Sequence, residues 1–199
     1  SGITRVLAVH PPEQWSSSLP TLSTPIVERI KLLLEAVSQQ TQDTSKLDEN
    51  LRNMSDEICV LATVIRSFYT VAKKQPNTTL DIVKAPLLSI LESVWPFIKH
   101  ISQNLSTKEV IVSSLSEFLL IVISLNDGTQ DIGILKEACE IAVAIIDTAS
   151  QQQKVNVNPI LEFVEDMVQT FGHLAEDHAL SLISSSTSSD INQQLFSII

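Results

Sequence analysis

The chain has 199 residues, of which 23 are acidic, 13 are basic and only four are glycine. A chain of this length buries a core without a disulfide or a metal, and so little glycine, against an average of about 7%, argues against Gly-rich phosphate loops and tight β-hairpins. The formal charge of −10 arises in residues 100–199, which hold 13 acidic and three basic side chains. This negative charge argues against direct binding of nucleic acid or of an anionic membrane.

Helical periodicity runs through almost the whole sequence, because apolar residues recur every three to four positions. The first helix is expected to start at Pro25, with Thr24 as its N-cap, and to fade in the polar stretch from Ser38 to Lys46. A second helix is expected from about Met54 to Lys74. The further expected helices are 80–104, 106–125, 131–150, 159–171 and 175–184, and a final apolar piece follows at 191–199.

The apolar run from Phe118 to Ile123 has two interpretations. A short continuous apolar run is typical of a buried strand as well as of a buried helix. A helix is favoured here because Ser106 and Glu109 are spaced like a capping box and the apolar positions from Val110 onward lead into the run without a break. The run is far shorter than the roughly 18 residues that indicate a membrane span, so we expect no membrane insertion.

The helices repeat with a period of about fifty residues, since the first helices of successive pairs are expected to begin near Asp56, Ser106 and Asn156. Helix pairs at a period of roughly 40–50 residues are typical of HEAT-type solenoids, in which each pair buries its apolar face against its neighbours. The sequence therefore predicts an all-α fold, a single HEAT-type superhelix of antiparallel helix pairs. The expected pairs are 3–45, 54–104, 106–150 and 156–199.

No motif in the sequence indicates catalysis. Gly128 and Gly133 have the spacing of a phosphate loop, but the lysine and the hydroxyl residue that must follow are absent. His173 and His178 are five positions apart and fall on different faces of a helix, unlike a zinc-binding pair four apart. We therefore expect a non-enzymatic protein without a metal or a cofactor.

Two segments of the chain resemble a known family. The run from Ile58 to Phe68 is followed, after a loop, by the run from Ile90 to Ile98 with its Trp95-Pro96 pair. Together they are similar to the mid-to-late HEAT repeats of the importin-β superfamily (karyopherin-β) of nuclear transport receptors. The subfamily that they resemble is transportin-SR, the import receptor of SR proteins, and the resemblance covers most of the chain.

The resemblance implies an interior segment of a longer receptor that carries protein cargo through the nuclear pore and shuttles between nucleus and cytoplasm. Such receptors bind Ran-GTP through N-terminal repeats, which this segment would lack; they also bind nucleoporins. They hold cargo with the second, inner helices of their repeats, here 80–104 and 131–150. Glu137, Glu140 and Asp147 are then candidates for binding a basic cargo surface. The competing interpretation of these three carboxylates is a solvated acidic face.

The chain departs from the SR-protein receptor at one helix that concerns cargo. The receptor has an arginine-rich helix after its Trp-Pro helix, where guanidinium groups can pair bidentately with phosphate. The corresponding residues 108–124 contain no arginine, which argues against recognition of phosphorylated Arg-Ser repeats there. The alternative function is a HEAT-repeat scaffold that assembles a cytosolic or nuclear multiprotein complex.

Overall fold

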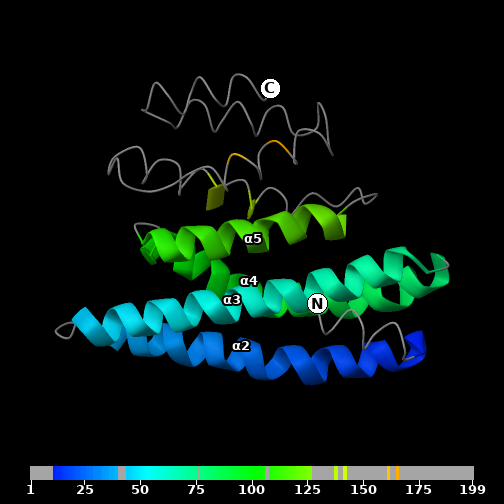
Figure 1. The fold of residues 1–199 in the computed structure, drawn as a ribbon, viewed down its shortest axis with the longest axis horizontal. Coiled ribbons are helices and arrows are strands. Elements are labelled where there is room, and N and C mark those ends of the chain that lie inside the picture. The colour runs from blue at the N-terminus through cyan, green and yellow to red at the C-terminus, as the bar shows by residue number, and fades with distance from the viewer. Residues whose placement is uncertain are drawn as a thin grey trace. The chain divides into compact units, whose positions relative to one another are not determined.

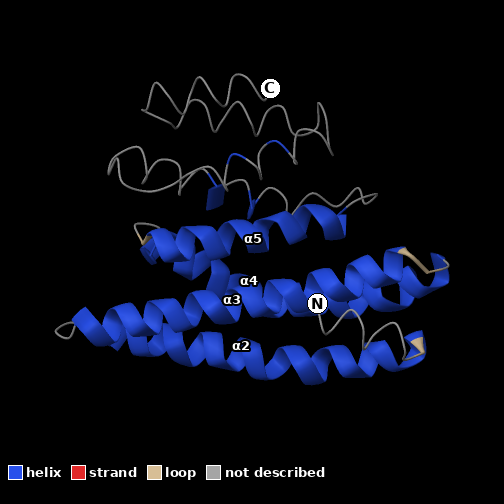
Figure 2. Ribbon diagram, in the orientation of Figure 1, coloured by secondary structure: helices blue, strands red, loops and turns tan. Residues whose placement is uncertain are grey.

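The computed structural model describes residues 11–39, 44–75, 77–105 and 108–126, together with 137, 138, 141, 142, 161 and 165. All secondary structure in these residues is helical (Figure 2), which confirms the predicted all-α fold for this part of the chain. The elements are a short 3-10 helix, η1 (Pro12–Gln14), and the α-helices α2 (Trp15–Gln39), α3 (Thr44–Lys73), α4 (Asn77–Leu105) and α5 (Glu109–Asn126).

The chain divides into two compact units, residues 1–98 and 99–199. In the first unit, α2, α3 and the first part of α4 run in alternating directions (Figure 1). The connections 40–43 and 74–76 are short, so each helix returns alongside the one before it. The helix α3 packs along α2, and the chain enters the second unit within α4.

Each helix of the first unit buries one stripe of apolar residues at helical spacing. The stripe of α2 includes Leu19, Ile26, Ile30 and Leu34; that of α3 includes Leu51, Met54, Ile58, Leu61 and Ile65; that of α4 includes Val83, Leu87, Leu91, Val94 and Ile98. None of these side chains is more than 9% exposed. The hydrophobic core of the unit is therefore continuous along the full length of the helices.

An aromatic pair joins α2 to α3 inside this core. Trp15 is 2% exposed and Phe68 is fully buried, and their rings meet edge to face with 6.3 Å between the centroids and 89° between the planes. Edge-to-face contact is a favoured geometry because it sets the positive edge of one ring against the negative face of the other. At the surface of the same interface, Arg29 Nη1 of α2 lies 3.1 Å from Glu57 Oε1 of α3.

The start predicted for the first helix is wrong, because α2 begins at Trp15 rather than at Pro25. The serines ahead of Pro25 fit into the helix: the Ser18 hydroxyl, for example, donates to the Gln14 carbonyl at 2.8 Å, which is a common way for serine to bond within a helix. Pro20 and Pro25 consequently lie inside α2, at exposed positions, where each removes one backbone hydrogen bond.

The start predicted for the second helix is also wrong, because α3 begins at Thr44 rather than near Met54. An apolar stripe continues through the mostly polar residues between 44 and 53. In it, Leu47 and Leu51 precede Met54 at spacings of four and three. Leu51 is 2% exposed, so packing against α2 extends the helix through a polar sequence. The third helix was expected at 80–104, and α4 confirms it within three residues at each end.

The apolar run from Phe118 to Ile123 is helical, as expected, and lies within α5. The capping serine predicted for this helix, Ser106, lies outside the described residues, and the Lys108 carbonyl accepts the first backbone bonds, from the N–H groups of Ile111 and Val112. Most described side chains of α5 are buried, including Ser114 and Ser116, whereas Val110, Ser113 and Glu117 form one exposed face at spacings of three and four. The helix α5 is therefore amphipathic, with a wide buried face and a narrow exposed one.

The later expected helices lie largely outside the described residues. Within 131–150 the structure describes 137, 138, 141 and 142, and within 159–171 it describes 161 and 165; all six are helical. The four apolar residues among them are buried, with Ala138, Ile141, Ala142 and Leu161 between 0 and 7% exposed. The helix pairs expected from the repeat period remain a prediction.

Candidate protein-binding site

A groove of about 340 Å³ lies between α2 and α4 in the first unit, within the usual size range of ligand sites. Five residues of α2 and four of α4 line it, and we call it the α2/α4 groove. They are Pro20, Ser23, Thr24, Val27, Glu28, Pro86, Ser89, Ile90 and Ser93. The two aliphatic members, Val27 and Ile90, are 9% and 8% exposed, so they form its floor.

Helical periodicity explains why these residues share one surface. In α2 the lining begins at Pro20 and continues at spacings of three or four to Glu28, so it follows one face of the helix. In α4 the lining residues from Pro86 to Ser93 follow the same spacing. Most of these side chains are small, so they leave space between the two helices. The groove is thus a consequence of the Ser, Thr and Pro content of both helices.

Two of the three serine hydroxyls in the groove donate to their own helices. Ser23 Oγ donates to the Leu19 carbonyl at 2.9 Å, and Ser93 Oγ donates to the Ile90 carbonyl at 2.8 Å. A hydroxyl has only one hydrogen to donate but two lone pairs. The oxygens of Ser23 and Ser93 can therefore only accept further hydrogen bonds.

Glu28 is the only charged residue in the lining. Its side chain is exposed, and no cation of the described residues lies within ion-pair distance of its carboxylate. The groove therefore carries a negative charge at its rim above an aliphatic floor.

Sequence reasoning predicted a binding role for none of the nine residues that line the groove. The pairing of 20–28 with 86–93 depends on how α2 and α4 pack, which no local pattern encodes. A partial signal was present: Pro20 and Pro86 each interrupt an apolar helical pattern and are followed by serine at the third position.

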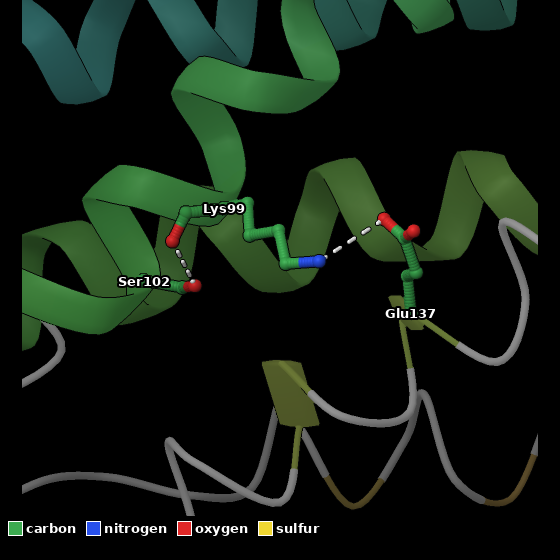
Figure 3. Close-up of polar contacts among 3 residues, drawn as sticks. All are labelled: Lys99, Ser102 and Glu137. Atoms are coloured by element: carbon green, nitrogen blue, oxygen red, sulfur yellow. Dashed lines mark hydrogen bonds and ion pairs between the residues drawn. The ribbon is translucent and has the colours of Figure 1, made fainter.

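The acidic candidates Glu137, Glu140 and Asp147 are only partly described. Glu137 Oε2 lies 3.6 Å from Lys99 Nζ, near the end of α4, and both side chains are 41% exposed. Figure 3 shows the Lys99 side chain extended toward Glu137, while Ser102 Oγ donates to the Lys99 carbonyl at 2.7 Å. Glu140 and Asp147 lie outside the residues whose side chains are described. Glu137 is therefore paired with a lysine of the same chain, and its role in binding cargo stays a prediction.

Replacement of Lys99 by methionine is expected to lower the free energy of unfolding by less than about 1 kcal/mol. Exposed ion pairs contribute little because water and side-chain entropy offset their attraction, and the loss is expected to shrink further in about 1 M salt. Urea unfolding of K99M, E137Q and the double variant measures the coupling energy of the pair. K108M, at an exposed lysine of the same unit, is the matched control. A coupling above about 2 kcal/mol would contradict this expectation.

Two further searches concern metals and membranes. Among the described residues, no three His, Cys, Asp or Glu side chains are grouped so that they could hold a metal ion. In the same part of the chain, no helix has the length and apolar character to cross a membrane.

Comparison with known proteins does not identify a relative. No family model matches the sequence, and no curated protein or solved structure matches it significantly. The resemblance to the importin-β superfamily therefore stays a prediction from sequence.

Proposed function

We propose that the chain is a non-catalytic, protein-binding segment of a nuclear transport receptor. The receptor would carry protein cargo through the nuclear pore under Ran-GTP control and shuttle between nucleus and cytoplasm, with nucleoporins and Ran bound by other parts of a longer protein. The observation that carries the proposal is the groove between α2 and α4. In the repeat scheme, α2 and α4 are the second helices of the pairs 3–45 and 54–104, and receptors of this class hold cargo with such helices.

The packing of the first unit supports this assignment. Long helices that alternate in direction, with connections of a few residues, make up the repeating unit of α-solenoids, whose stacked surfaces bind protein partners. The helix α3 packs along α2, while α2 and α4 together line the groove. In this scheme α3 is a first helix, and α2 and α4 are two second helices that border a depression. This is the relation expected between adjacent HEAT pairs.

The test is the response of captured partners to Ran. The longer protein that contains this segment is immobilised and exposed to nuclear and cytosolic extracts, with Ran locked in its GTP form or, as the matched control, in its GDP form. We expect a set of captured proteins that is released or recruited by Ran-GTP and unaffected by Ran-GDP. An unchanged set with no Ran bound contradicts the transport proposal and favours the alternative, a HEAT scaffold that assembles a multiprotein complex.

A further inference from the structure

We propose that the exposed face of α3 binds a second copy of this chain in an antiparallel dimer. The face runs along the helix from Asp48 to Lys74, and an acidic half precedes a basic half. Two such faces are complementary when the helices lie antiparallel, because the acidic half of each then meets the basic half of the other. The inference goes beyond the proposed function and does not rest on it.

The charges of α3 are segregated along the sequence. Residues 44–57 hold four acidic and two basic side chains, whereas residues 58–74 hold three basic side chains and no acidic one. Glu57 is paired with Arg29 of α2 and does not belong to the face. We call Asp48, Glu49 and Asp56 the acidic half, and Arg66, Lys73 and Lys74 the basic half; all six residues are exposed.

The helix dipole does not account for this segregation. The dipole favours acidic residues in the first turn of a helix and basic residues in the last turn, and its effect falls off beyond these turns. Asp56 lies more than three turns after the start of α3 at Thr44, and Arg66 lies about two turns before its end at Lys73. The segregation in the middle of the helix is therefore a property of its surface and not of its ends.

The acidic half borders a depression of about 450 Å³. The depression is lined by Ser45, Asp48, Glu49, Arg52, Asn53 and Asp56. Its lining thus contains all three carboxylates of the acidic half and no apolar side chain. Lysine and arginine side chains of a second copy can lie in it, with their methylene stems along the helix and their charged groups at the carboxylates. The basic half supplies two lysines and one arginine for this contact.

The spacing of the charges sets the register of the dimer. Asp56 and Arg66 are each five positions from residue 61, Glu49 and Lys73 are each 12 positions from it, and Asp48 and Lys74 are each 13. When residue 61 lies opposite residue 61 of the second copy, each of these acidic residues lies opposite its basic counterpart. The two-fold symmetry repeats every contact, so three complementary positions give six opposite-charge pairs.

The centre of the face suits a close approach of two helices. Val60 is 46% exposed, and Thr63 is exposed one turn further along. Thr63 Oγ1 donates to the Cys59 carbonyl at 2.8 Å, so covering this hydroxyl leaves no donor hydrogen without an acceptor. Val60 and the methyl group of Thr63 thus offer an apolar contact between the two charged halves.

The contact is small, and the dimer is therefore weak. One helix face on each side gives an interface at the low end of the size range, and each exposed ion pair contributes little. The first unit adds little long-range repulsion, because residues 1–98 hold ten acidic and nine basic side chains. We therefore expect a dimer that forms at high protein concentration and dissociates in salt.

The experiment is analytical ultracentrifugation of the whole 199-residue chain at concentrations up to about 1 mM, the range of weak association. We expect an equilibrium between monomer and dimer in about 50 mM salt. In about 500 mM salt we expect the association to be at least about tenfold weaker, because ions screen exposed charges. A chain that stays monomeric at low salt, or a dimer that salt does not weaken, would overturn the proposal.

Two charge-reversal variants test the complementarity of the halves. The first makes the acidic half basic, and the second makes the basic half acidic. Each variant alone is expected to associate at least about tenfold more weakly than the unchanged chain, because like charges then meet. An equal mixture of the two is expected to regain the original affinity within about threefold. The first carries D48K, E49K and D56R, and the second carries R66E, K73E and K74E.

The matched control is the triple variant E13K, E28K and E35K, which reverses three exposed carboxylates outside α3. It changes the net charge as much as the first variant does and is expected to change the association less than about threefold. An equal effect of the control, unchanged association of either variant, or no recovery in the mixture would each overturn the proposal. Recovery also shows that the variants are folded. Parallel helices would set like charges together, so loss in each variant with recovery in the mixture identifies the antiparallel dimer.

Discussion

Truncation of Trp15 to alanine is expected to lower the free energy of unfolding of the first unit by about 3–5 kcal/mol, the usual cost of removing a large buried aromatic side chain. Trp15 is 2% exposed and contacts Phe68 edge to face, so its loss leaves a cavity between α2 and α3 as well as an unmatched ring. Urea unfolding followed by far-UV circular dichroism measures the effect.

The control for this prediction is Leu32→Ala on the same helix. Leu32 is 61% exposed, and substitutions at such positions usually change stability by no more than about 0.5 kcal/mol. A double-mutant cycle with Phe68→Leu is expected to show a coupling of about 0.5–1.5 kcal/mol, typical of aromatic pairs. A loss below about 1 kcal/mol for Trp15→Ala would mean that α2 and α3 do not meet at this pair in solution.

Replacement of Pro25 by alanine is expected to stabilise the protein by about 2 kcal/mol. Proline inside a helix costs roughly 3 kcal/mol relative to alanine, because it removes a backbone hydrogen bond and its ring meets the preceding turn. About 1 kcal/mol of this gain is lost again, since alanine makes the unfolded chain more flexible. Pro25 is exposed, so no core contact is lost. Thermal and urea unfolding measure the change.

Pro11→Ala is the matched control for Pro25→Ala. Pro11 precedes η1 and lies outside the helices, and only its carbonyl is used, as the acceptor for the Gln14 N–H at 3.0 Å. The substitution is therefore expected to lower stability slightly, by no more than about 1 kcal/mol, through the unfolded state alone. If Pro25→Ala lowered stability as well, α2 would not continue through residue 25, and the start predicted from the sequence would be correct after all.

The class of the fold could be predicted because periodicity reports directly on buried helix faces. The stripe from Ile58 to Phe68 and the apolar positions from Val110 to the run 118–123 are long enough to separate helix from strand. The helix starts could not be predicted, because they depend on tertiary contacts that override weak local preferences. Ser16 and its serine neighbours look like a loop in the sequence, yet they join α2 because Trp15 and Leu19 bury against the rest of the unit.

The candidate site was less accessible to sequence reasoning than the fold. The acidic residues chosen from the sequence follow helical spacing, but spacing cannot show that Glu137 has Lys99 beside it. The α2/α4 groove combines residues more than sixty positions apart, so its discovery requires the packing of the helices. Sequence patterns show which residues share one face of a helix. Which other part of the chain lies against that face is determined by the fold.

The burial of the apolar run in α5 has a consequence for the synthesis of the protein. Its segment 118–123 has six apolar residues without charge, proline or glycine, a composition typical of strands that stack into amyloid. In the folded chain, Phe118, Leu119, Ile121 and Val122 are at most 2% exposed, and the helix occupies their backbone hydrogen bonds. The first unit can fold as it leaves the ribosome, but α5 must wait for the rest of residues 99–199. Substitutions that delay folding of this second unit should therefore first become visible as insoluble deposits.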